Sequence, residues 1–152
     1  MSEHIIDLNW KSESEEFKYE TYDRTHQIQF AGGQTLSNSA AKDFLGNEEY
    51  SNPEELLVAA LSSCQMLTFL AIAAKKKLIV KEYTDKSVGI LEKGSNGKLQ
   101  ITKIYLRPHI RFTKETTPTE EVFAKLHETA HINCFIGNSI SSEVIIEPVL
   151  LT

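Results

Sequence analysis

One long apolar stretch, residues 53–74, constrains the fold of this chain more than any other feature. Asn52 and Pro53 precede it and two glutamates follow, which is the pattern of a helix start. Asparagine accepts from free backbone N–H groups, proline needs no N–H partner there, and carboxylates favour the positive end of the helix. Three lysines, residues 75–77, follow at the negative end. We therefore predict one long helix over this stretch.

The predicted helix has apolar side chains on nearly all sides, so most of its surface must be buried. Its length would suit a membrane span, but the polar centre at residues 62–65 and the charged flanks favour a core helix. A chain of 152 residues cannot easily cover such a helix alone. We expect a second subunit to supply part of the covering, next to the small residues Ala59, Ala60, Ser62 and Ser63.

The composition limits the class of protein. With 152 residues, 41% of them hydrophobic, residues 1–152 are predicted to form a single domain. The net charge of −5 argues against a nucleic-acid partner, because phosphates require a basic surface. The first residues lack the basic and apolar segments of a secretion signal, so we expect a cytoplasmic protein with reduced cysteines and no membrane partner.

Alternating apolar and polar residues predict the strands. This period-two pattern is found at residues 17–22 and 26–30 and more roughly at 78–92 and 99–112, and further strands are predicted at residues 5–10 and 144–148. Asn96-Gly97 predicts a hairpin turn, and residues 35–50 show no clear period and are predicted to be a long loop. Two helices with hairpin-connected strands place the chain in the α+β class, with antiparallel sheets.

The second helix is predicted to start after a Thr117 cap and to end near residue 130. We expect its inward side chains to be Val122, Phe123, Leu126 and Ala130. Proline cannot donate to a strand ladder, so the strand that contains Pro108 is predicted to be an edge strand or to be bulged there.

Cys64 and Cys134 are the two cysteines of the chain, and their spacing alone leaves three interpretations open. In the first interpretation, both are buried core residues, since free cysteine behaves as a small hydrophobe. Alternatively, they join His127 and His131 in a metal site. As a third possibility they form a redox pair, which requires Cα atoms within about 4.4–6.8 Å and a cation that favours the thiolate.

Two sequence blocks decide between these interpretations. They are Asn52-Pro-Glu-Glu-Leu-Leu-x-Ala-Ala-Leu-Ser-x-Cys64-x-Met-Leu-Thr and Ala130-His-x-x-Cys134-x-Ile-x-Asn-Ser139, with residues 89–93 between them. In this order and separation they resemble the OsmC/Ohr family, the osmotically inducible protein C and organic hydroperoxide resistance proteins. The resemblance covers about residues 22–148. It implies an OsmC-like fold, with antiparallel sheets, a long buried central helix and a second helix, as an intertwined homodimer.

The resemblance also implies a function. The chain is expected to be a thiol-dependent peroxidase that reduces organic hydroperoxides, and hydrogen peroxide more weakly, with no metal or flavin cofactor. Cys64 would be the peroxidatic thiolate and Cys134 the resolving cysteine, so that an external dithiol or lipoyl-type reductant is needed. Glu54 matches the family's glutamate, and Arg24 corresponds to its arginine. Gln65 stands where relatives often carry histidine or an aromatic residue, which affects substrate preference.

These roles are physically consistent. Arg24 would stabilise the Cys64 thiolate, and Glu54 would fix the guanidinium through a bidentate pair. Ten helical residues span about 15 Å, so Glu54 and Cys64 of one helix cannot share one small site. We therefore expect the Arg24–Glu54 pair of one subunit to meet Cys64 of the other.

The expected substrate pocket is apolar and suits a fatty or aromatic hydroperoxide. Its predicted lining consists of Leu57, Leu61, Met66, Phe69 and Phe135. Two alternative functions also follow from the residues: a non-catalytic OsmC-like binding domain, and a His/Cys metal-binding module.

Overall fold

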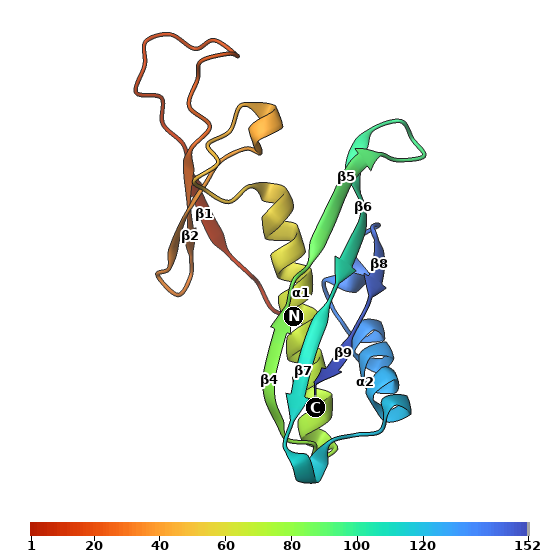
Figure 1. The fold of residues 1–152 in the computed structure, drawn as a ribbon. Coiled ribbons are helices and arrows are strands. Elements are labelled where there is room, and N and C mark those ends of the chain that lie inside the picture. The colour runs from red at the N-terminus through yellow and green to blue at the C-terminus, as the bar shows by residue number, and fades with distance from the viewer. Residues whose placement is uncertain (152) are drawn as a thin grey trace. The chain divides into compact units, whose positions relative to one another are not determined.

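The computed structural model describes residues 1–151, and the backbone forms two compact units, Met1–Leu56 and Leu57–Thr152. The first unit contains one antiparallel sheet, in the order β1-β2-β3. Its strands are β1 (Ile6–Asn9), β2 (His26–Phe30) and β3 (Thr35–Asn38), followed by a 3-10 turn, η1 (Lys42–Phe44) (Figure 1).

The predicted strand at residues 17–22 is wrong, because this segment forms a turn. The backbone N–H groups of Thr21 and Tyr22 both donate to the carbonyl of Lys18, at 3.1 and 2.9 Å. Phe17 and Tyr22 of this segment pack with Trp10 in a ring cluster. The predicted loop at 35–50 contains a strand, β3, which is too short to show a period.

The predicted helix start is confirmed. Helix α1 (Pro53–Lys75) begins in the first unit and continues into the second. The N–H of Glu55 donates to Oδ1 of Asn52 at 2.9 Å, and the N–H of Asn52 donates to Oε2 of Glu55 at 3.2 Å. This reciprocal pair is a capping box, which satisfies two otherwise free donors.

The second unit adds six strands in two sheets, ordered β4-β7-β9 and β5-β6-β8. The strands are β4 (Val80–Asp85), β5 (Val88–Lys93), β6 (Leu99–Leu106), β7 (Pro108–Phe112), β8 (Glu143–Ile146) and β9 (Val149–Leu151). The α+β class is confirmed, and the predicted antiparallel pairs β4–β7 and β5–β6 are present. The last two strands extend the sheets by parallel pairing, β8 with β6 and β9 with β7.

Asp85 explains why two long predicted strands are each divided. Its carboxylate accepts from Ser87 Oγ and from the Arg107 N–H, both at 2.7 Å, and from Ser62 Oγ of α1 at 2.5 Å. These bonds fix the break between β4 and β5 beside the break between β6 and β7. Pro108 is the first residue of β7, a position where the missing N–H is tolerated. β7 is the central strand and not the predicted edge, and the register shift of the β4–β7 pair lies between Val80 and Glu82 and not at Pro108, where a bulge was the other prediction.

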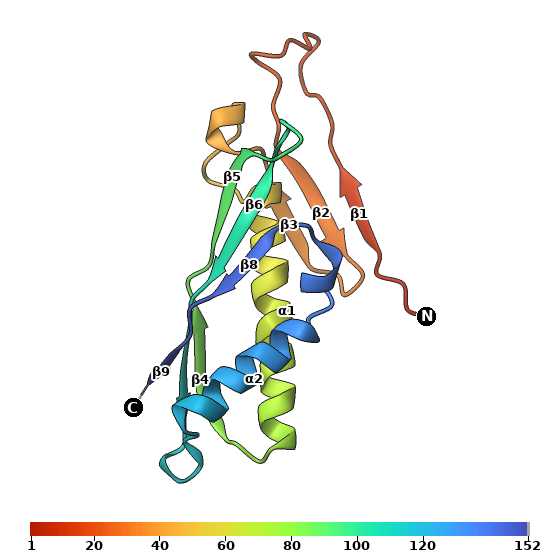
Figure 2. The ribbon, with the colours of Figure 1, turned by 90° about the vertical axis from the view of Figure 1, so that its right-hand side faces the viewer.

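Helix α2 (Glu120–Ile132) starts two residues later than predicted. Its N-cap is Thr119, whose side chain accepts from the Val122 N–H at 3.3 Å. Val122 is exposed, so its predicted core position is wrong, whereas Phe123, Leu126 and Ala130 are buried as predicted. Both helices lie on the same side of the strands of this unit (Figure 2).

Two hydrophobic clusters form the core of the second unit. Phe69 and Ala73 of α1 pack against side chains of β7 and α2 in the first cluster. Leu61 packs with side chains of β6 and with Cys134 in the second. One stripe of α1 is thus buried, while Leu67 on another side is 59% exposed. Among residues 1–151, α1 is also the one helix whose length and composition would allow it to cross a membrane. The buried core helices of other proteins meet the same two criteria.

Candidate active site

The structure brings the two cysteines together. Cys64 lies in the middle of α1 and is half-buried, whereas Cys134 follows α2 directly and is completely buried. Cys64 packs against the core cluster that contains Cys134, and its thiol is close enough to contribute to the raised pKa of the Cys134 thiol. Both are free thiols. Side chains 70 positions apart in the sequence therefore share one site, while their catalytic roles stay predictions.

The segment after α2 holds Cys134 in place. The N–H of Cys134 donates to the carbonyl of His131 at 3.2 Å, and the N–H of Gly137 donates to Cys134 Sγ at 3.3 Å. Burial raises the pKa of Cys134 to about 11, with a smaller contribution from the neighbouring Cys64 thiol, and the Gly137 N–H opposes this shift. Cys134 is therefore a protonated thiol at neutral pH.

Cys64 borders an open groove of about 780 Å³ in the second unit. Its walls are mostly small or apolar side chains of α1, among them Ala60, Leu67 and Ala71, together with Phe135. Lys75 also lines the groove, roughly 16 Å along the helix from Cys64. Of the two cysteines, only Cys64 lines this groove.

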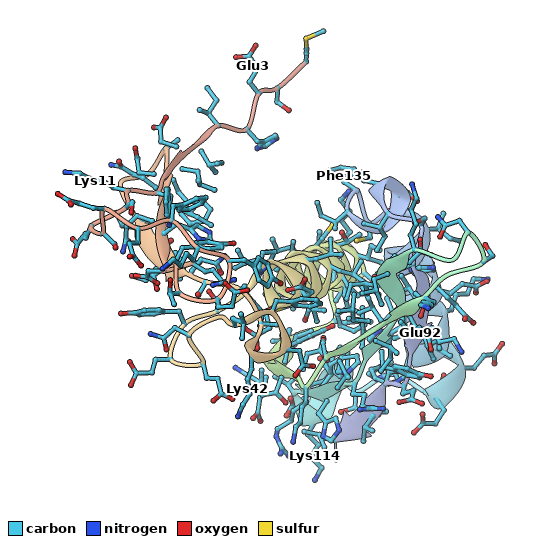
Figure 3. All side chains as sticks on the ribbon, turned by 90° about the horizontal axis from the view of Figure 1, so that it is seen from above. Glu3, Lys11, Lys42, Glu92, Lys114 and Phe135 are labelled. Carbon is cyan, nitrogen blue, oxygen red and sulfur yellow. The ribbon has the colours of Figure 1, made fainter. Side chains whose placement is uncertain are left out.

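The predicted substrate-lining residues have different locations. Phe135 is 81% exposed, is labelled in Figure 3, and lines the groove next to Cys64. Leu57 and Met66 are half-buried. Leu61 and Phe69 have no exposed surface and belong to the two core clusters, which corrects their predicted role from substrate contact to packing.

Arg24 belongs to the first unit and is only 9% exposed. Its guanidinium donates to the carbonyls of Tyr22 and Tyr19, at 2.8 and 2.6 Å, and lies 3.9 Å from the centre of the Tyr22 ring. Within residues 1–151 no ion pair joins Arg24 to Glu54, whose Oε2 is buried and has no hydrogen-bond partner. The Arg24–Glu54 and Arg24–Cys64 pairs stay predictions.

A second cavity, of about 620 Å³, surrounds Arg24 within the first unit. Four aromatic side chains line it: Trp10, Phe17, Tyr19 and Tyr22. The sequence motifs gave no indication that these residues are functional. The available signal was four aromatic residues within a short and otherwise polar segment that leads directly to Arg24.

The structure does not assemble the predicted metal ligands. The described residues contain no group of three or more His, Cys, Asp or Glu side chains that could hold a metal ion. The ring of His127 stacks on Phe69, with centroids 4.5 Å apart, and meets the Phe123 ring edge-on at 4.8 Å. Burial lowers the pKa of His127 to about 4. His127 is therefore a packing residue of the core.

Comparisons with solved structures support the fold. An OsmC-like protein of unknown function from Vibrio cholerae O1 is 45% identical, with a TM-score of 0.94, over 98% of this chain and 100% of that one. The organic hydroperoxide resistance protein OhrB of Bacillus subtilis has the same fold, with a TM-score of 0.63 and 14% identity, over 99% of this chain and 98% of that one.

Sequence comparisons are consistent with this result. The uncharacterized protein YmaD of Bacillus subtilis strain 168 is 27% identical over 115 residues, which are 75% of this chain and 76% of that protein. The family model described as OsmC-like protein matches residues 46–148, a range that contains both cysteines and all of α1. This chain belongs to the OsmC-like family.

Proposed function

We propose that this protein is a thiol-dependent peroxidase that reduces organic hydroperoxides, and hydrogen peroxide more weakly. The observation that carries the proposal is the contact between two thiols in different environments. Cys64 borders an open groove, and Cys134 is buried and protonated behind it. Organic hydroperoxide resistance proteins from Legionella pneumophila and Elizabethkingia anophelis have the same fold, which is consistent with this function.

The proposed cycle has three balanced steps. The Cys64 thiolate attacks the O–O bond of the hydroperoxide, which gives a sulfenic acid and, after uptake of one proton, an alcohol. The Cys134 thiol then displaces the sulfenic oxygen, so that a Cys64–Cys134 disulfide forms and water leaves. An external dithiol, for example of the lipoyl type, reduces this disulfide by exchange and is itself oxidised to a disulfide.

The proposal includes a homodimer. The groove beside Cys64 contains the exposed Leu67 and the small side chains Ala60 and Ala71, a surface on which a second copy can pack closely. In the dimer, Arg24 of the partner subunit stabilises the Cys64 thiolate, and Glu54 of the partner subunit orients that arginine. The proposal places the enzyme in the cytoplasm, where a reducing environment regenerates both thiols.

Stopped-flow mixing of the reduced protein with an organic hydroperoxide, followed by mass spectrometry, tests the function. We expect rapid loss of one equivalent of peroxide and an intramolecular Cys64–Cys134 disulfide. Cys64→Ser abolishes the reaction, because the nucleophile is missing. Cys134→Ser consumes one equivalent and then stops as a sulfenic acid or becomes over-oxidised. A reaction no faster than that of free cysteine overturns the proposal.

A further inference from the structure

The turn after α2, residues 134–139, is folded around the sulfur of Cys134. Its second half is the 3-10 turn η3 (Gly137–Ser139), which lies between α2 and β8 (Figure 2). The N–H of Gly137 donates to Cys134 Sγ at 3.3 Å, and the carbonyl of Cys134 accepts from the N–H of Asn138 at 3.0 Å. Because its own N–H is also bonded, Cys134 is held at its N–H, its carbonyl and its sulfur.

Further hydrogen bonds hold the turn itself in place. The side-chain amide of Asn138 donates to the Ile132 carbonyl at 3.1 Å, and Ser139 Oγ donates to the Phe135 carbonyl at 2.7 Å. The N–H of Ser139 donates to the Ile136 carbonyl at 2.9 Å. The N–H that faces the cysteine sulfur is therefore fixed in position and direction.

Gly137 supplies this N–H without a special backbone conformation. Among the glycines of residues 1–151, only Gly33 and Gly97 have a positive φ. A Cβ atom added at Gly137 would lie 3.5 Å from Cys134 Sγ and 3.7 Å from Cδ1 of Leu61, which are ordinary van der Waals contacts. Position 137 therefore tolerates a methyl group, and what it provides to the cysteine is the backbone donor.

A donor at this position favours the charged form of the thiol, because an N–H stabilises a thiolate more than a neutral S–H group. The N–H groups of Gly137 and Ile136 lower the pKa of Cys134, although burial has the larger and opposite effect. A completely buried sulfur that becomes negative has no water to stabilise it, so a fixed donor replaces the missing hydration. In the proposed cycle the Cys134 sulfur carries negative charge twice, when it attacks and when it leaves.

We propose that the backbone N–H of Gly137 is a further catalytic group, which stabilises negative charge on the Cys134 sulfur in both of these steps. This role rests on the proposed peroxidase cycle. In the first step the Cys134 S–H bond breaks, its sulfur bonds to Cys64 Sγ, and the sulfenic S–O bond breaks, so that the hydroxide leaves with the proton as water. In the second step an external thiolate attacks Cys64, and the electron pair of the S–S bond moves to the Cys134 sulfur, which faces the N–H.

Gly137→Pro removes the donor, and Gly137→Ala, which keeps it, is the matched control. Loss of a hydrogen bond to a charged group lowers the thiolate fraction by roughly tenfold, and the opposing gain in nucleophilicity leaves about threefold in rate. We therefore expect Gly137→Pro to form the Cys64–Cys134 disulfide about threefold more slowly in stopped flow. Reduction by dithiothreitol of the disulfide formed with diamide should slow by a similar factor. The reaction of Cys64 with the hydroperoxide should keep its rate, because Cys134 takes no part in it.

Proline also disfavours the helical backbone of the preceding Ile136 (φ −67°, ψ −42°), so an ester provides the second test. A synthetic segment of residues 134–152, with an ester in place of the amide of residue 137, is ligated at Cys134 to residues 1–133 to give the full chain. The ester lacks the N–H and adds no bulk. An ester at Ser139, which removes the N–H bonded to the Ile136 carbonyl, is the control for a weakened turn. Circular dichroism verifies that each chain is folded.

The ester chains decide the outcome. Slower formation and reduction of the disulfide in the ester-137 chain, with natural rates in the ester-139 chain and in Gly137→Ala, support the role of the N–H. Natural rates in the ester-137 chain, or equal slowing in both ester chains, overturn it and leave the peroxidase function standing. If Cys64 of the natural chain reacts with the hydroperoxide no faster than free cysteine, the peroxidase function fails. The rate of reduction by dithiothreitol then still tests whether the N–H of Gly137 assists the departure of Cys134.

Discussion

At the scale of single residues, the enclosed imidazole of His127 makes stability depend on pH in the acidic range. Both of its ring nitrogens lack hydrogen-bond partners, and burial lowers its pKa from 6.5 to about 4. Below pH 6.5 the unfolded chain therefore binds a proton that the folded chain does not bind until about pH 4. The stability contributed by neutral His127 is complete above pH 6.5 and is lost as the pH falls toward 4, by about 3 kcal/mol in total.

We predict that His127→Phe removes this pH-dependent contribution to the free energy of unfolding, because phenylalanine keeps the ring contacts and takes up no proton. Urea unfolding at pH 7.0 and 4.5 measures it: the variant should lose less stability between these pH values than the natural protein, by about 2–3 kcal/mol. His109→Gln, a change at an exposed histidine, is the control and should leave the dependence unaltered. Equal losses in His127→Phe and the natural protein would contradict the prediction.

Which residues meet in the candidate site could be predicted from the sequence only where a motif contains them. The blocks around Cys64 and Cys134 indicated that the two thiols meet, and the structure places them in contact. Arg24 was predicted to be the arginine that stabilises the thiolate, but the surroundings of its side chain were not predicted. They depend on a turn whose carbonyls at Tyr19 and Tyr22 receive the guanidinium donors, and on ring packing that has no sequence period. Leu61 and Phe69 were assigned to the substrate because apolar character does not distinguish a lining from a core.

At the scale of elements, the approach of β5 to α1 depends on a missing side chain. A Cβ atom at Gly89 would lie 2.7 Å from Cγ2 of Val58, which is closer than real Cβ contacts. Valine in a helix has essentially one favourable rotamer, so Val58 cannot turn away. The absence of a side chain at Gly89 therefore lets the strand and the helix pack closely.

We predict that Gly89→Ala destabilises the protein by about 2 kcal/mol, because it overpacks this contact. In Gly89→Ala/Val58→Ala the clash is absent, so the two changes should cost clearly less together than the sum of the single costs in a double-mutant cycle. Chemical denaturation measures all three variants. Gly32→Ala is the matched control, since an added Cβ there meets no atom within 4 Å, and it should cost less than about 0.5 kcal/mol. Additive costs for Gly89 and Val58 would refute the explanation.

Elements with strong end signals were predicted well, and elements defined by distant partners were not. The start of α1 was located correctly because Asn52, Pro53 and the first-turn glutamates are a local code that the capping box satisfies. The turn at residues 17–22 has the same alternation as a strand, so periodicity could not distinguish the two. The parallel pairing of β8 with β6 and of β9 with β7 depends on contacts between strands that are far apart in the sequence.

At the scale of the whole molecule, the exposed side of α1 is where a second copy is expected. We predict that Leu67→Glu, which places a charge in the groove beside Cys64, converts the dimer to a monomer that keeps its helical circular dichroism. Peroxidase activity should fall close to the rate of free cysteine, because Arg24 of the partner subunit no longer stabilises the thiolate.

Light scattering coupled to size-exclusion chromatography measures the oligomeric state of this variant. Leu99→Glu is the control, since Leu99 is 57% exposed, similar to Leu67, but lies outside the groove lining. It should remain dimeric and active. A Leu67→Glu protein that is still a fully active dimer would show that the interface lies elsewhere. The sequence indicated a second subunit because α1 is apolar on more sides than one chain of this length covers.

In the proposed cycle, the unequal burial of the two sulfurs also determines which sulfur the external thiol attacks during regeneration. We expect an incoming thiolate to attack the sulfur of Cys64, the less buried of the two cysteines, so that the mixed disulfide forms there and Cys134 departs as the leaving group. A thiol with a pKa of about 11 is a poor leaving group and, once released, a strong nucleophile that attacks the mixed disulfide again. We therefore expect a monothiol to be displaced repeatedly by Cys134, whereas a dithiol of the lipoyl type forms its own cyclic disulfide and releases Cys64.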